Sequence, residues 1–126
     1  METVYLIARQ NNRTAWKTLL ERRGYHVHLN GVAGRPAAGP IPSLILMDVE
    51  NWAPSQSLEA IREMRSAFPD VEILVVAGAE LQRCDPITAG ARACVRRPID
   101  PAVFCGLVDR MARGTGENSG NGANGM

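Results

Sequence analysis

The chain has 126 residues, 45% of them hydrophobic, and its formal net charge is +1 at pH 7. This length suits one domain, which can bury a core without disulfides or a structural metal, and the near-neutral charge argues against direct electrostatic binding of nucleic acid. No run approaches the ~20 apolar residues of a membrane span, so we expect no membrane segment. The three cysteines form no C-x-x-C pair, so we expect no zinc site. Because no secretory leader is visible either, we expect a cytoplasmic protein.

The first elements read as a strand followed by a helix. Residues 3–8, TVYLIA, are apolar without polar alternation, which is typical of a strand buried on both faces of a parallel sheet. Asn11 or Asn12 is expected to cap the next helix. Trp16 lies on the apolar stripe of that helix, so we expect it in the core. Gly24 ends the helix.

The middle of the chain continues the alternation. Residues 25–29 predict a short second strand, and residues 31–42 contain three prolines and three glycines, which exclude a regular helix there. Residues 44–49, LILMDV, are the most apolar predicted strand and carry one acid, Asp48. A helix with an apolar stripe is predicted from about Ser57 to Ala67.

The last third adds two strands and two helices. Residues 71–77 and 93–96 read as strands. Asp85 and Asp100 each precede a proline, a pair typical of a helix start. In the final helix we expect these side chains to point inward: Val103, Leu107, Val108 and Met111. Cys105 in the same helix is expected to be buried.

Five strands that alternate with helices predict a parallel α/β sheet covered on both faces. Sites in such folds form at the carboxyl ends of the strands, which points to residues 7–10, 48–52, 77–79 and 96–98. Residues 1–113 are expected to form this domain. Residues 114–126, GTGENSGNGANGM, are expected to be a flexible tail or linker, because they offer almost nothing that packs.

Four segments together resemble the receiver domain of response regulators in two-component signalling. They are LLERRGYHV, LILMDVE, SLEAIREMRSAFPDVEILVVAG and AGARACVRRPIDPAVF, and they span roughly residues 3–112. The resemblance implies a flavodoxin-like three-layer sandwich with a five-stranded parallel sheet in the order 2-1-3-4-5. Against that pattern, the second helix is expected to be missing and the fourth to be shortened.

The resemblance also implies a phosphorylation pocket, which this sequence matches at one position. Asp48 occupies the phosphoacceptor position. The pair of acids that helps to hold Mg²⁺ in the family maps to Ile7 and Ala8, or to Ala8 and Arg9, and neither register supplies a carboxylate. Ala77 stands where a Thr or Ser is usual. We therefore expect weak or absent Mg²⁺ binding, because this ion needs several hard oxygen ligands.

Arg97 stands where the family has a lysine, keeping the charge without the compact ammonium group. For Asp48 we expect a partly exposed carboxylate, hydrogen-bonded or paired with Arg97 or Arg9. Phosphorylation of Asp48 is the alternative.

The resemblance suggests a partner surface at Cys94, Val95 and Ile99, where receivers commonly dimerise or meet output domains. Trp52, in the loop after Asp48, either anchors a partner or shields that loop. We expect a protein partner or output domain, leave a homodimer open, and expect neither membrane nor direct nucleic-acid binding.

Three functions are compatible with these features. The favoured one is an atypical receiver, a pseudo-receiver that acts as a phosphorylation-independent interaction module and is not an enzyme. The alternative is a genuine receiver phosphorylated on Asp48 by a histidine kinase, and residual autophosphorylation at this residue stays open. A flavodoxin-like binder of a phosphate-bearing cofactor ranks last, because the residues ARQNN after the first strand are not a Ser/Thr/Gly-rich phosphate loop.

Overall fold

A five-stranded parallel sheet forms the centre of the molecule. The computed structural model describes residues 2–30, 41–78, 85–96 and 98–113. The strand order is β2-β1-β3-β4-β5, and every neighbouring pair is parallel, which confirms the predicted sheet. The strands are β1 (Thr3–Ile7), β2 (His26–Asn30), β3 (Leu44–Asp48), β4 (Glu72–Ala77) and β5 (Ala93–Arg96).

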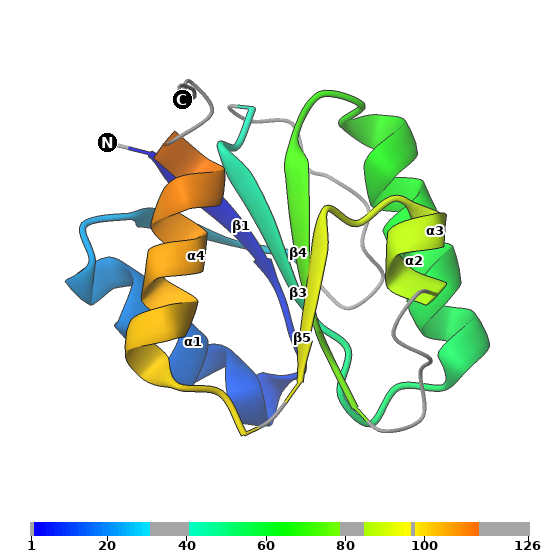
Figure 1. Ribbon diagram of the computed structural model, residues 1–126, viewed down its shortest axis with the longest axis horizontal. Coiled ribbons are helices and arrows are strands. Elements are labelled where there is room, and N and C mark those ends of the chain that lie inside the picture. Colours follow the sequence, from blue (N-terminus) through cyan, green and yellow to red (C-terminus); the bar gives the residue numbers. More distant parts are fainter. Residues whose placement is uncertain (1, 31–40, 79–84, 97, 114–126) are drawn as a thin grey trace.

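Helices cover both faces of the sheet, so the described residues form three layers (Figure 1). Helices α1 (Gln10–Arg22) and α4 (Pro101–Arg113) lie on one face, and α2 (Pro54–Ala67) and α3 (Asp85–Ala89) lie on the other. The five-residue α3 is the shortened helix that the sequence predicts. Residues 31–40, where the second helix is expected to be missing, and the predicted tail at 114–126 lie outside the described residues.

The core is divided by the sheet into two apolar clusters. Alternate side chains of β1, β3 and β4 point to opposite faces, so Leu6 and Leu46 pack with Trp16 on the α1 and α4 side, and Ile45 packs with Ile61 on the α2 and α3 side. All four residues of the edge strand β5 are only half-buried. Part of each of these residues therefore stays accessible to solvent.

Two helix starts differ from the sequence prediction. The N-cap of α1 is Arg9, which makes no side-chain capping bond, so neither Asn11 nor Asn12 caps this helix. Helix α2 begins at Pro54, three positions before Ser57, because proline has a fixed φ and lacks the N–H that the first helical position leaves unpaired. The predicted cap at Asp100 is confirmed, since its Oδ1 accepts a hydrogen bond of 2.9 Å from the backbone N–H of Ala102.

Helix α4 buries Val108 and Met111 and packs Leu107 against the core, as predicted, but differs from the prediction near its start. Val103 is 68% exposed, whereas Phe104 is 2% exposed and belongs to the core. Cys105 is half-exposed, so its predicted burial is wrong. The predicted inward position of Val103 is therefore wrong, because the neighbouring Phe104 packs against Trp16 in its place.

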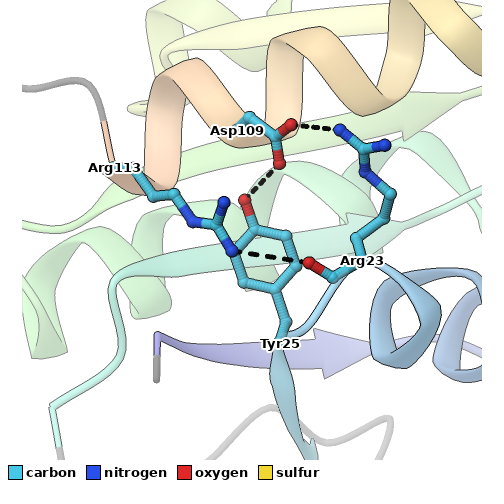
Figure 2. Close-up of polar contacts among 4 residues, drawn as sticks. All are labelled: Arg23, Tyr25, Asp109 and Arg113. Carbon is cyan, nitrogen blue, oxygen red and sulfur yellow. Dashed lines mark hydrogen bonds and ion pairs between the residues drawn. The ribbon is translucent and has the colours of Figure 1, made fainter.

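A polar cluster of Arg23, Tyr25, Asp109 and Arg113, here called the Asp109 cluster, holds the end of α4 against the start of β2 (Figure 2). The Tyr25 hydroxyl donates to Asp109 Oδ1 at 2.5 Å, and the Arg23 guanidinium forms an ion pair with Asp109 Oδ2. The Arg113 guanidinium lies over the Tyr25 ring, 4.7 Å from its centroid. This combination of cation–π contact and charged hydrogen bonds fixes the last turns of α4.

The pKa values in the Asp109 cluster follow from these contacts. Burial, reinforced by the hydrogen bond to Asp109, raises the pKa of Tyr25 well above its ordinary value. Burial alone would raise the pKa of Asp109, but hydrogen bonds from Tyr25 and Arg23 outweigh it, so that pKa is lowered. The carboxylate of Asp109 is therefore favoured in the folded protein.

In the described part of the chain, no helix has both the length and the apolar character needed to cross a membrane.

Candidate functional site

The carboxyl ends of four strands meet at one edge of the sheet. Asp48 ends β3, Ile7 ends β1, Ala77 ends β4 and Arg96 ends β5. The register pairs Ile7 with Met47 and Ala77 with Arg96. This edge is where the topology of a parallel α/β sheet places binding sites, and the sequence-predicted positions come together there.

Asp48 is held by three hydrogen-bond donors. The indole Nε1 of Trp16 donates to Asp48 Oδ2 at 2.6 Å, and the side-chain amide of Asn12 donates to the same oxygen at 3.2 Å. The backbone N–H of Glu50 donates to Asp48 Oδ1 at 3.1 Å. Hydrogen bonds to an ionised carboxylate are about twice as strong as neutral ones, so these donors stabilise a charge that would otherwise be costly to bury.

The surroundings of Asp48 differ from the expected ones. The residue is 1% exposed, so the expectation of a partly exposed carboxylate is wrong. Hydrogen bonding is confirmed, but the donors are uncharged. The described residues form no ion pair with Asp48, and Arg9 is exposed, so the predicted pairing with Arg9 is wrong. Arg97 lies outside the described residues, and its pairing with Asp48 stays a prediction.

The positions expected to lack acids are fully buried and apolar. Ile7 and Ala8 are each 0% exposed. The Ala8 carbonyl accepts hydrogen bonds from the Arg13 guanidinium, at 3.4 Å from Nε and 3.3 Å from Nη2. The positively charged Arg13 guanidinium therefore lies at the end of β1, and the carboxylates that could bind a metal ion there are absent from Ile7 and Ala8.

These residues do not fit a magnesium ion. Mg²⁺ needs near-octahedral oxygen coordination, usually through carboxylates together with water and phosphate. Asp48 is the one carboxylate at the ends of β1 and β3, and both of its oxygens already accept hydrogen bonds. The described residues contain no group of three or more acidic, histidine or cysteine side chains that could hold a metal.

The ends of β4 and β5 carry a methyl group and a cation. Ala77 is 1% exposed and offers no hydroxyl to a group on Asp48. The Arg96 guanidinium extends across to β4 and donates from Nη1 to the Gly78 carbonyl at 3.2 Å. Arg96 therefore ties the ends of the two strands together.

Trp52 is not a surface residue. It is 3% exposed and belongs to the apolar cluster beneath α2, which disagrees with its place on a partner surface and agrees with the alternative that it shields the loop. The preceding Asn51 has a φ of 68°, a left-handed conformation that reverses the chain and returns the indole to the core. Among the described residues its buried Nε1 has no hydrogen-bond partner.

The other residues of the expected partner surface lie together beside β5. Cys94, Val95 and Ile99 line a surface hollow of about 350 Å³. The exposed Val103 of α4 forms part of its wall. The hollow lies at the open edge of the sheet, and its lining is mixed, because Arg96 and Asp100 also contribute to it.

Solved structures similar to this chain are receiver domains. The receiver domain of a sensor histidine kinase from Pseudomonas aeruginosa is 24% identical, with 88% of this chain and 97% of that chain covered and a TM-score of 0.71. The signal receiver domain of a histidine kinase from Syntrophus aciditrophicus is 17% identical, with 98% of each chain covered and a TM-score of 0.75. The chain has the receiver-domain fold.

A response regulator from Thermotoga maritima is also similar, with 21% identity, coverage of 89% of this chain and 98% of that chain, and a TM-score of 0.65. No family model and no curated protein matches the sequence. The receiver domain from Pseudomonas aeruginosa was crystallised with a magnesium ion coordinated in its active-site cleft. The corresponding end of this receiver-like sheet has hydrogen-bond donors around a single carboxylate.

Sequence reasoning misses two residues of this site. Trp16 is correctly expected in the core, but its bond to Asp48 is not predicted. Asn12 is expected to cap α1 and instead reaches Asp48. The available signal is their spacing, because residues four apart share one face of a helix and α1 begins at the end of β1.

Proposed function

We propose that this chain is an atypical receiver domain that acts in two-component signalling as a phosphorylation-independent interaction module. The supporting observation is the state of Asp48, which is buried and hydrogen-bonded through both oxygens to Trp16, Asn12 and Glu50. Phosphoryl transfer depends on positioning and on neutralising negative charge. Here the donors that stabilise the carboxylate are uncharged groups of the protein itself.

The pocket also disfavours phosphorylation of Asp48 for a second reason. Ile7 and Ala8 stand where acids would help to bind Mg²⁺, so few ligands for this ion remain. Without Mg²⁺, the negatively charged phosphodonor would have to approach the Asp48 carboxylate with no metal ion to offset the two negative charges. A phosphoryl group on Asp48 would also have to displace donors from the oxygen that it occupies: Trp16 and Asn12 at Oδ2, or the Glu50 N–H at Oδ1. The chain is accordingly proposed to be a binding protein of the cytoplasm without catalytic activity.

We further propose that the face formed by β5 and the start of α4 contacts a protein partner, such as an output domain or a histidine kinase. Its support is the surface hollow, in which Cys94, Val95, Ile99 and the exposed Val103 lie beside the charged Arg96 and Asp100. Apolar side chains that stay exposed beside a free sheet edge are typical of interaction surfaces. A homodimer through the same face would appear as concentration-dependent sedimentation.

The proposal is tested by titrating the ¹⁵N-labelled full chain with beryllofluoride, a phosphoryl mimic, in the presence of Mg²⁺. We expect no saturable amide shifts at Asp48 and Ala77, whereas a phosphorylatable receiver domain titrated in parallel should saturate. Incubation with acetyl phosphate should leave the intact mass unchanged. A mass increase that disappears in Asp48→Asn would instead establish a genuine phosphoacceptor.

A further inference from the structure

One side chain, Trp16, contacts both Asp48 and helix α4. Its Nε1 donates to Asp48 Oδ2 at 2.6 Å, and its ring lies 4.8 Å from that of Phe104, centroid to centroid, with the planes tilted by 38°. Both rings are buried, with Trp16 7% and Phe104 2% exposed. The indole therefore spans the space between the end of β3 and the first half of α4.

We propose that Trp16 links Asp48 to α4, so that the hydrogen-bonding state of Asp48 sets the position of the first half of α4. This inference rests on the proposed function only in taking Asp48 to be held by protein donors. The bond to Asp48 fixes the rotation of the indole about its side-chain torsions. Phe104 packs against that fixed ring, and a close-packed interior passes a ring movement on to its neighbours.

The residue at the end of β4 cannot couple a change at Asp48 to the rest of the fold in this chain. Ala77, at the end of β4, has only a methyl group, which cannot form a hydrogen bond to a group at Asp48. The Trp16 indole has both an N–H that binds the carboxylate and a large apolar face that packs on α4. It can therefore couple a polar change to a packing change, which Ala77 cannot do.

The far end of α4 is fixed independently, which confines the expected movement. In the Asp109 cluster, Asp109 accepts hydrogen bonds from Tyr25 and Arg23, and Arg113 stacks on the Tyr25 ring (Figure 2). The cluster joins the last turns of α4 to the start of β2, whereas Asp48 lies at the carboxyl end of β3. A change at Trp16 should then tilt the Phe104 end of α4 about a stationary Asp109 end.

The Phe104 end of α4 borders the hollow beside β5. Val103, the residue before Phe104, forms part of the wall of that hollow. A tilt at Phe104 therefore changes the shape of the proposed partner surface. By linkage, a partner that prefers one shape must in turn favour one state of Asp48.

The test compares amide spectra of the ¹⁵N-labelled full chain with those of Trp16→Phe, which keeps most of the apolar ring and removes the N–H. We expect shifts at Asp48 and at Phe104 and Cys105, with smaller shifts at Asp109 and Arg113. Trp52→Phe is the matched control, because that indole is similarly buried but lies on the other face of the sheet. It should leave α4 unshifted.

Asp48→Asn supplies a second arm that does not alter the aromatic packing. The side-chain N–H signal of Trp16 should move upfield, because a hydrogen bond to a charged acceptor becomes one to a neutral acceptor, and the same α4 amides should shift. The link is refuted if α4 responds no more to Trp16→Phe than to Trp52→Phe. It is equally refuted if Asp48→Asn moves the indole signal and leaves Phe104 unmoved. If Trp16→Phe does not fold, the Asp48→Asn arm decides alone.

The two proposals fail in different experiments. Saturable binding of beryllofluoride would overturn the phosphorylation-independent function, while leaving shifts at Phe104 in Trp16→Phe to support the link. If beryllofluoride does not bind and the α4 amides do not shift in the variants, the phosphorylation-independent function is supported and the proposed link between Asp48 and α4 is overturned.

Discussion

Asp48 shows how a buried carboxylate is stabilised by hydrogen bonds where the described residues form no ion pair with it. Burying an isolated charge is strongly unfavourable, and here two side-chain donors and one backbone N–H supply the compensation. The arrangement depends on residues from two elements, because Asn12 and Trp16 belong to α1 while Asp48 ends β3. The carboxylate therefore also ties this helix to the sheet.

Removing the carboxylate should weaken the fold. In Asp48→Ala, the buried Trp16 N–H loses its acceptor, and we expect a loss of roughly 1 to 3 kcal/mol in the free energy of unfolding. Urea unfolding followed by circular dichroism measures it. Asp70→Ala, at an exposed position, is the control and should be close to neutral. An Asp48→Ala protein as stable as the unmodified chain would contradict this account of the three bonds.

The two tryptophans provide a matched pair for the hydrogen bond itself. Trp16→Phe and Trp52→Phe remove the same atoms from buried sites, but only Trp16 has an observed bond to lose among the described residues. Trp16→Phe should therefore destabilise the protein by about 1.5 to 3 kcal/mol more than Trp52→Phe, the range for a bond to a charged group. Equal urea midpoints would show that the bond contributes no net stability.

For single residues, the sequence predicted where a residue lies in the fold better than it predicted which atoms that residue contacts. The place of Asp48 at a strand end and the burial of Trp16 followed from apolar patterning, because burial is what patterning reports. The partner of Asp48 did not follow. The nearby arginines suggested an ion pair, whereas the structure uses the neutral donors of Asn12 and Trp16, and no one-dimensional pattern specifies which polar atom faces which across a core.

At the scale of elements, the prediction of five parallel strands was correct because β1, β3 and β4 are apolar runs and clear breakers separate the strands. Helix boundaries were less well predicted. Pro54 begins α2 before its apolar stripe does, and in α4 the apolar pattern predicted that Val103 points inward, whereas packing against Trp16 buries Phe104. Such choices depend on the neighbouring element and not on the helix itself.

The turn between α3 and β5 depends on Gly90. Its φ is +130°, and a Cβ there would lie 2.9 Å from both Cβ and Cγ of Arg65. The Arg65 guanidinium donates to the Gly90 carbonyl from Nε at 3.1 Å and from Nη2 at 2.9 Å, so α2 is joined to this turn. The close approach requires a residue without a side chain.

Gly90→Ala should accordingly destabilise the protein by about 1 to 3 kcal/mol, through the strained backbone and the displaced Arg65. Gly106→Ala is the opposite case: it lies within α4, and nothing is within 4 Å of a Cβ there. It should stabilise by about 0.5 to 1 kcal/mol, because alanine favours the helix. Thermal unfolding of both variants compares them. A Gly90→Ala variant with an unchanged midpoint would mean that the turn tolerates a side chain.

On the scale of the whole molecule, the chain has the receiver-domain fold, and we propose that its pocket does not support phosphorylation. The sheet order and the three layers match those of receiver domains, yet the strand ends present Ile7, Ala8 and Ala77. Fold and site are thus separable, as expected when function depends on a few side chains placed on a stable scaffold. The resemblance found in the sequence predicted the fold correctly, whereas the loss of the phosphorylation chemistry stays a proposal.

The Asp109 cluster should make stability depend on acid. The pKa of Asp109 in the folded protein lies below its ordinary value of 3.8, so its carboxylate adds stability above that value and loses it as the pH falls through the folded-state pKa. Asp109→Asn should be less stable than the unmodified chain at neutral pH, and the difference should shrink below about pH 4. Urea midpoints measured from pH 7 to about pH 3 would show the convergence.

The control for the acid experiment is Glu63→Gln, which changes an exposed carboxylate on α2. Its urea midpoint should follow that of the unmodified chain at every pH. If Asp109→Asn also follows it, with no convergence in acid, then the hydrogen bonds from Tyr25 and Arg23 do not contribute to stability.

The position of Asn12 and Trp16 on one face of α1 has a consequence for other sequences. Both residues reach Asp48 because they are four positions apart and because the helix starts directly after β1. An asparagine and a tryptophan with this spacing, combined with an aspartate that ends a later apolar strand and no acid before the helix, form a short searchable signature. Genomes can be scanned for it. Each hit is expected to be a domain whose aspartate is hydrogen-bonded by its own helix, so the signature separates such domains from metal-binding ones by sequence.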